Sequence, residues 1–123
     1  MSEKLIIQES TIINEKEVVL EVEEQVTIEN FKASGQMLVD SDNLSFVYLM
    51  ENEEGYTYIV LPTNNWKDLK TILENNGSVY LSNKKERLLL TNFQEELSYL
   101  IDNIKGNSNY GEKMVTEVET VFA

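Results

Sequence analysis

The sequence predicts an α+β protein, with an antiparallel sheet of about six or seven strands and three helices, the last two C-terminal and adjacent. Three observations predict it. In the first two thirds of the 123 residues, β-branched and aromatic residues alternate with polar ones. Three later stretches carry apolar residues at helical spacing. No repeat, low-complexity tract or linker is visible, so we expect residues 1–123 to form a single domain.

The N-terminal strands are expected at 5–9 and 17–23, with shorter candidates at 26–28 and 36–40. In the strand at 17–23, valine and leucine alternate with glutamate, which is typical of a strand with one face on a core and the other in water. These strands therefore place acidic side chains on the surface.

The strands expected at 44–51 and 56–61 are apolar on both faces. The loop between them, 52–55, suits a hairpin because Gly55 can adopt a positive φ. We place this hairpin at the centre of the sheet. If the helices cover one of its faces, the other needs a cover from a curled sheet, from the N-terminal strands or from a second copy of the chain. A homodimer is one hypothesis, since a large exposed apolar patch is unusual on a monomer.

Pro62 ends the strand region, and Thr63 or Asn64 is expected to cap a helix. Its apolar positions are Trp66, Leu69, Ile72 and Leu73. The pair at 76–77 predicts a left-handed C-cap, and a second hairpin is expected from strands at 79–81 and 87–90.

Two helices finish the chain. The first begins at Asn92, where Glu95 three residues later gives a capping-box pattern, and it ends at Gly106. The second begins near Asn109, with Glu112 three residues later. Each carries an apolar stripe at helical spacing.

The residue types that are missing exclude most chemistry. The chain has no Cys and no His, so it has neither a thiolate nor an imidazole, and only carboxylates, Lys, Tyr, Ser and Thr remain as reactive groups. We expect no catalytic residue, no cofactor and no metal site, and an activity that is not enzymatic.

The net charge of -12 repels both nucleic-acid phosphates and anionic membranes. The first four residues lack the basic and apolar regions of a signal peptide, and no apolar run is long enough to span a bilayer. We therefore expect a cytoplasmic protein that binds neither nucleic acid nor membrane.

Charge is uneven along the sequence. Residues 1–31 hold eight acids against two lysines, whereas residues 67–87 hold five bases against three acids. The acidic N-terminal strands are thus the candidate surface for a protein partner, and a basic one in particular.

Two polar segments resemble functional motifs without completing them. Residues 40–43 open like a calcium loop, but Leu44 and Ser45 stand where a ligand and a glycine belong, so a turn held by its own Asp and Asn side chains is favoured. Residues 106–111 have the glycine spacing of a phosphate-binding loop but lack the Lys and Ser or Thr that follow it, which favours a linker between helices.

The segments 39–46 (VDSDNLSF) and 99–116 (YLIDNIKGNSNYGEKMVT) carry a resemblance to a known family. With them, the chain resembles uncharacterised protein family 0738, a set of small acidic proteins from Gram-positive bacteria. The resemblance runs over nearly the whole chain. It implies no activity, cofactor or catalytic residue, because the family has no assigned function.

The candidate interaction or ligand residues lie in those two segments, which are rich in Asn, Asp and Gly as loops that carry function often are: Asp40, Asp42, Asn43, Asn107, Asn109, Tyr110, Gly111 and Glu112. They serve either function or only turn and cap geometry. The sequence favours a non-enzymatic cytoplasmic interaction module with an acidic surface. The alternative is a small-molecule binder or carboxylate-dependent enzyme with a cleft between the 40–43 turn and the 107–112 joint.

Overall fold

The computed structural model describes residues 3–24, 26–53 and 55–122. Within them the chain forms eight strands, three α-helices and two short 3-10 helices. The strands are β1 (Glu3–Ile6), β2 (Glu9–Ile13), β3 (Glu17–Glu21), β4 (Lys32–Asp40), β5 (Ser45–Asn52), β6 (Gly55–Pro62), β7 (Ser78–Ser82) and β8 (Arg87–Leu89). The helices are η1 (Thr63–Asn65), α1 (Trp66–Asn75), α2 (Phe93–Ile104), η2 (Ser108–Tyr110) and α3 (Glu112–Phe122).

The strands form two sheets of four, in the orders β1-β6-β5-β4 and β2-β3-β7-β8. The α+β class with three helices is confirmed. The single antiparallel sheet of six or seven strands is wrong, because β1 pairs with β6 and β3 pairs with β7 in parallel. Parallel neighbours are joined by long connections, and the local signals that identify hairpins say nothing about them.

The predicted strand at 5–9 is divided between the two sheets. Ile6 ends β1 against β6, and Glu9 begins β2 against β3. Between them, Ile7 is buried in the core and its N-H donates to the carbonyl of Val60. The candidate strand at 26–28 is a loop, and the one at 36–40 is the end of the longer β4.

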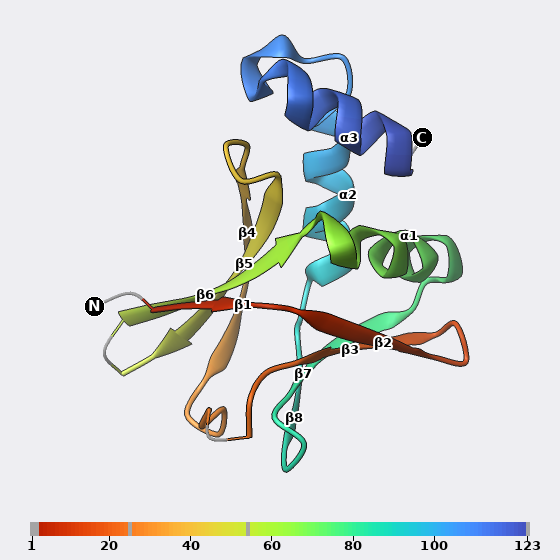
Figure 1. The fold of residues 1–123 in the computed structure, drawn as a ribbon. Coiled ribbons are helices and arrows are strands. Elements are labelled where there is room, and N and C mark those ends of the chain that lie inside the picture. The colour runs from red at the N-terminus through yellow and green to blue at the C-terminus, as the bar shows by residue number, and fades with distance from the viewer. Residues whose placement is uncertain (1–2, 25, 54, 123) are drawn as a thin grey trace.

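The hairpin of β5 and β6 occupies the centre of its sheet, as predicted. It is paired in register from Ser45 opposite Pro62 to Asn52 opposite Gly55, and Gly55 has a φ of 135°. The second predicted hairpin, β7 with β8, is also present. Figure 1 shows the chain passing from one sheet to the other where β1 runs on into β2, with the β4-β5 turn on the side of the helices.

The three helices close one core. α2 packs against β4, α1 packs against β3, and α3 packs against both other helices. One apolar cluster includes the inner face of β5 and β6, the strands β3 and β7, and the buried stripes of all three helices. Trp66 is fully buried at its centre, with ring contacts to Phe46 and Phe122.

The predicted helix caps are wrong in detail. Thr63 and Asn64, the predicted caps of α1, lie in η1, and the residue that directly precedes α1 is Asn65. The side chains of Asn65 and of Asn92, which precedes α2, make no capping hydrogen bond. The Nδ2 group of Asn65 instead donates to the carbonyl of Ile7, and that of Asn92 donates to the carbonyl of Gly35. These amides tie the helices to neighbouring strands, and long-range contacts of this kind compete with local capping. The left-handed C-cap of α1 is confirmed at Asn76, with a φ of 53°.

Candidate functional site

The outer face of the β1-β6-β5-β4 sheet is the candidate site. Side chains alternate along a strand, so Phe46, Tyr48 and Met50 of β5 enter the core while Val47 and Leu49 point to the other side. Val47, Leu49 and Val60 form a small apolar cluster of their own, against which Tyr58 packs. The predicted two-sided apolar hairpin is therefore present.

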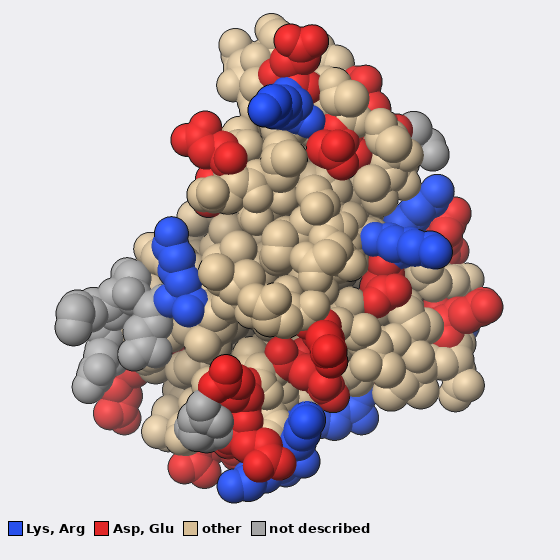
Figure 2. All heavy atoms as spheres, viewed as in Figure 1, with Lys and Arg blue, Asp and Glu red and all other residues tan. Residues whose placement is uncertain are grey.

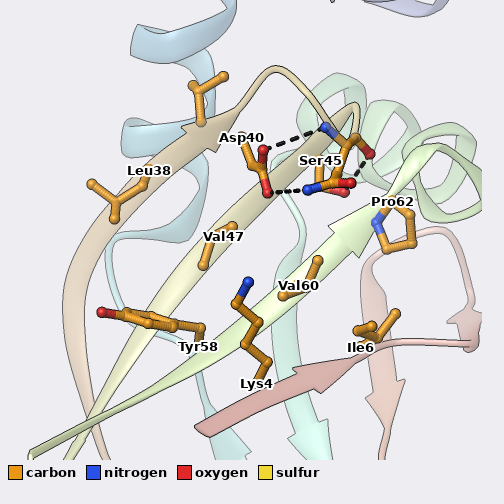
Figure 3. Close-up of a pocket in the computed structure, with 11 residues that line it drawn as sticks. Lys4, Ile6, Leu38, Asp40, Ser45, Val47, Tyr58, Val60 and Pro62 are labelled. Atoms are coloured by element: carbon orange, nitrogen blue, oxygen red, sulfur yellow. Dashed lines mark hydrogen bonds between the residues drawn. The ribbon is translucent and has the colours of Figure 1, made fainter. Parts of the chain in front are cut away.

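Among the residues that the structure describes, the margins of this outer face stay exposed. Ile6 on β1 is 55% exposed, and Leu38 on β4 is 50% exposed. The face is hollowed into a pocket of about 450 Å³ whose floor is the central valines. Figure 3 shows its lining, which comes from all four strands and the β4-β5 turn: Lys4, Ile6, Leu38, Val39, Asp40, Asn43, Ser45, Val47, Tyr58, Val60 and Pro62.

One base and one acid line this hollow. Lys4 comes from the edge strand β1, and Figure 3 shows its ammonium group extending over the floor toward Val60. With the side chains that the structure describes, that ammonium makes neither a hydrogen bond nor an ion pair. Asp40 lies on the opposite edge strand, β4. The hollow thus combines an apolar floor with opposite charges at its two margins.

The 40–43 turn is held by its own polar side chains. The two carboxylate oxygens of Asp40 accept hydrogen bonds from the backbone N-H and the side-chain amide of Asn43, at 3.3 and 2.8 Å. The Ser45 hydroxyl donates to the carbonyl of Asn43, and Leu44 adopts a φ of 47°, which is uncommon for a residue other than glycine. The predicted turn, held by its own Asp and Asn side chains, is present.

No group of three or more acidic side chains in the described ranges is placed to hold a metal ion. Nor does any helix in those ranges have the length and apolar character needed to cross a membrane.

The 107–112 joint is also held from within. The side chain of Asn107 accepts a hydrogen bond from the N-H of Asn109, and the backbone of Gly111 has a φ of 91°. Tyr110 is half-buried against the core, and Glu112 begins α3. The Asn107 side chain thus has a structural role in the joint.

The two loops do not share the hollow. Asp40 and Asn43 line it, whereas no residue of 107–112 does. Both loops lie toward the same end of the molecule in Figure 1. The side-chain hydrogen bonds described for each loop stay within it or reach its adjoining strand or helix. Asp42 is exposed and lies outside the hollow. A cleft between the loops stays a prediction.

The acidic strands lie beside the basic β7-β8 turn, because β3 pairs with β7. Glu17 forms an ion pair with Arg87 at 3.6 Å, and Lys84 shares a second hollow with Glu21 and Glu23. Figure 2 shows acidic and basic groups intermixed around the lower strands. The charges that are separated along the sequence are therefore partly neighbours in space.

Tyr48 anchors the central strand and has no access to either hollow. Its hydroxyl is buried, donates to the carbonyl of Thr91 at 2.5 Å and accepts from the N-H of Gly35 at 3.1 Å. Burial raises the pKa of this phenol above its ordinary value of 10.0, and the nearby Glu96 carboxylate acts in the same direction. The neutral phenol ties β5 to β4 and to the start of α2.

Sequence reasoning found the floor of the hollow and, at one margin, Asp40 and Asn43, but it missed Lys4, Ile6 and Leu38. The floor follows from the two-sided apolar pattern of β5 and β6. Lys4 and Ile6 reach the face only because β1 pairs in parallel with β6, and Leu38 reaches it because β4 is the other neighbour of the hairpin. The only hint in the sequence was that Lys4 and Ile6 alternate onto one face of the first strand. That hint becomes informative only once the strand next to β1 is known.

Fold and site together define a small α+β protein of two four-stranded sheets, one of which has an open apolar face. Residues 6–122 match the model of a family of unknown function, UPF0738. A UPF0738 protein of Bacillus pumilus (strain SAFR-032) is 42% identical over 122 residues, which cover 99% of both chains.

Two further relatives are a UPF0738 protein of Geobacillus sp. (strain WCH70), 41% identical over 78% of this chain and 77% of its own, and one of Bacillus cereus (strain G9842), 39% identical over 80% of each. The chain belongs to the UPF0738 family, as the resemblance of its two polar segments implied. No solved structure matches the fold.

Proposed function

We propose that the chain is a non-enzymatic cytoplasmic protein-interaction module, and that a protein packs on the outer face of the β1-β6-β5-β4 sheet. The observation that carries the proposal is the open apolar hollow of about 450 Å³, with Ile6 and Leu38 half exposed at its margins. Contiguous apolar surface of this kind marks interaction sites on proteins. The lack of Cys and His supports a role other than catalysis.

The acidic N-terminal strands are a second surface of the same module, suited to a basic partner. Glu9 and Glu21 are direct neighbours across β2 and β3, where like charges destabilise a pair of strands. A basic side chain bound between them would relieve that repulsion. Lys84 and Arg87 lie close to these glutamates and partly neutralise their negative charge. This surface therefore supports the proposal less strongly than the hollow does.

The alternative function is that of a small-molecule binder or carboxylate-dependent enzyme. Its support is that the hollow has the size of a ligand pocket, roughly 300–1,000 Å³, and that Asp40 and Asn43 line it. Both oxygens of Asp40 are engaged by Asn43, which favours a structural carboxylate over a reactive one.

Site-specific photo-cross-linking in cells of the source species tests the interaction module. A photoreactive residue replaces Leu38 at the hollow or, as a matched control, Leu89 on β8, which is 45% exposed on the other sheet. The proposal predicts a discrete cross-linked band from position 38 and none from position 89. Adding Ile6→Glu at the rim of the hollow should remove that band.

The absence of a band from position 38, or bands of equal strength from both positions, would refute the interaction module. A ligand that raises the melting temperature of the purified chain, with no band from position 38, would favour the small-molecule alternative.

A further inference from the structure

We propose that the protein packing on the outer face is a second copy of this chain, in a two-fold dimer that places Lys4 of each subunit opposite Asp40 of the other. This inference rests on the proposed function, and it names the partner. It follows from three features of the face: its local charge, the positions of its two charged residues, and its shape.

The hollow is electrically neutral on a strongly acidic chain. One base, Lys4, and one acid, Asp40, are the charged residues of its lining, whereas the whole chain carries a net charge of -12. Two such chains repel one another on most of their surfaces. The lining of this hollow adds no net charge to that repulsion, and each copy offers there both members of an ion pair.

Lys4 and Asp40 stand at opposite corners of the face. They lie on the two edge strands, β1 and β4, with the hairpin of β6 and β5 between them. Along the strands, Lys4 lies opposite Tyr58 of β6. Asp40 lies opposite Ser45, which in turn lies opposite Pro62 of β6. The two charged residues are therefore offset by four residues along the strand direction. Three strand spacings amount to about 14 Å, and four residues along a strand also amount to about 14 Å.

A two-fold axis in the plane of the interface can exchange these two corners, and because the two distances are nearly equal that axis runs at about 45° to the strands. The axis passes between Val47 and Val60 and brings each Lys4 over the Asp40 of the other copy. The two sheets then cross at roughly 90°, which is one of the two common arrangements for packed sheets.

The same axis also pairs the exposed apolar side chains with apolar surface. It carries Leu38, at the margin, over the strand positions of Leu49 and Tyr58 in the other copy. Four strands and about three rows of side chains give a footprint of roughly 400 Å² per subunit, which is below the usual size of a stable interface. We therefore expect a dimer that dissociates on dilution.

Sedimentation velocity of the purified full chain, from low micromolar to near millimolar concentration, tests the dimer. The wild-type mass should rise with concentration from 14.2 kDa toward twice that value. Leu38→Glu should hold the chain at the monomer mass, whereas Leu89→Glu on the other sheet should leave the association unchanged.

A charge exchange tests the arrangement. Lys4→Glu and Asp40→Lys should each raise the dissociation constant by about tenfold or more, because each sets two like charges against each other. An equimolar mixture of the two variants should recover wild-type association, since both pairs are again of opposite sign. Asp40→Lys also removes the hydrogen bonds to Asn43, so the melting temperature of each variant is measured to show that it is folded.

A wild-type mass of 14.2 kDa at every concentration would overturn the second copy as partner, and so would a mixture that fails to recover. The cross-linking at position 38 separates the two proposals. A band that contains a different protein, together with a purified chain that stays monomeric, would overturn the dimer and leave the interaction module standing. A band of twice the chain mass would support both.

Discussion

The two faces of the β1-β6-β5-β4 sheet are built by the same four strands, yet the helices and the second sheet, as far as the structure describes them, cover only one of them. On the inner face, Phe46, Tyr48 and Leu61 are fully buried beneath the helices and the second sheet. On the outer face, Val47, Leu49 and Val60 form a small separate cluster against which Tyr58 packs, and Ile6 and Leu38 stay half exposed. A strand that is apolar on both faces thus indicates that each face must be shielded from water, but it does not show which part of the molecule, or which partner, shields the second face.

The largest expected difference between the faces is in stability. Leu61→Ala removes a fully buried side chain from the inner face and should lower the free energy of unfolding by about 3–5 kcal/mol. Leu49→Ala makes the same chemical change on the outer face, where Leu49 is 8% exposed and packs in a small cluster with Val47 and Val60, and should cost less, about 2–3 kcal/mol in the monomer. Urea denaturation at low protein concentration measures both, and equal losses would remove the distinction between the faces.

Tyr48→Phe probes how the inner face is tied to the edge strand. The variant leaves the N-H of Gly35 and the carbonyl of Thr91 without their partner and should cost about 1–3 kcal/mol. Denaturation of both proteins at neutral pH measures this cost. A loss below about 0.5 kcal/mol would show that water replaces the hydroxyl without penalty.

The same pair of proteins gives a pH dependence with a definite sign. Because the pKa of Tyr48 is raised in the folded chain, its contribution is fully present below pH 10.0 and is lost as the pH rises through the folded-state pKa. The difference in unfolding free energy between the wild type and Tyr48→Phe should therefore shrink above pH 10.0. A difference that grows with alkaline pH would contradict the buried neutral phenol.

Changing the salt concentration distinguishes contact through the outer face from contact through the acidic strands, although the expected effect is smaller than those of the substitutions above. Association of two chains of charge -12 through a neutral face should strengthen a few-fold when salt screens their repulsion. Binding of a basic partner to the acidic strands should weaken under the same change. Sedimentation at low and moderate salt distinguishes these outcomes, and self-association that falls steeply with salt would point to the charged strands as the contact.

The smallest expected effect is that of Leu38→Thr, which places a β-branched polar residue on the exposed margin of β4. Surface changes of this kind alter unfolding free energy by no more than about 0.5 kcal/mol, so the monomer should be nearly unaffected while self-association is weakened. Thermal unfolding of dilute protein measures the first quantity. A loss above about 2 kcal/mol would mean that Leu38 serves the fold of the single chain.

Local pattern predicted much of the fold. The central hairpin, the β7-β8 hairpin and the three helices follow from alternation, turn residues and helical spacing. The parallel pairings of β1 with β6 and β3 with β7 do not, because their partners lie far apart in sequence. Asn92 illustrates the same limit of local pattern. Its position predicts a helix cap, but its side-chain amide instead donates to the distant carbonyl of Gly35.

The candidate site was predicted in part for the same reason. The two-sided apolar pattern of residues 44–61 indicated an uncovered face, and the structure has one. Of the candidate loop residues, only Asp40 and Asn43 line the hollow, whereas Asn107 and Gly111 shape a joint elsewhere. Polar composition marked both loops equally, because a turn that needs unusual backbone angles and a loop that binds a ligand use the same residues.

Carbene footprinting of the wild-type chain at low and high concentration tests the central claim most directly, since it needs no substitution. The account predicts that Ile6 and Leu38 are labelled readily in dilute solution and become protected as the concentration rises, while Leu89 on the other sheet is labelled equally at both. Equal labelling of Ile6 and Leu38 at all concentrations, or protection of both already at high dilution, would contradict an outer face that is open in one chain and covered by a second.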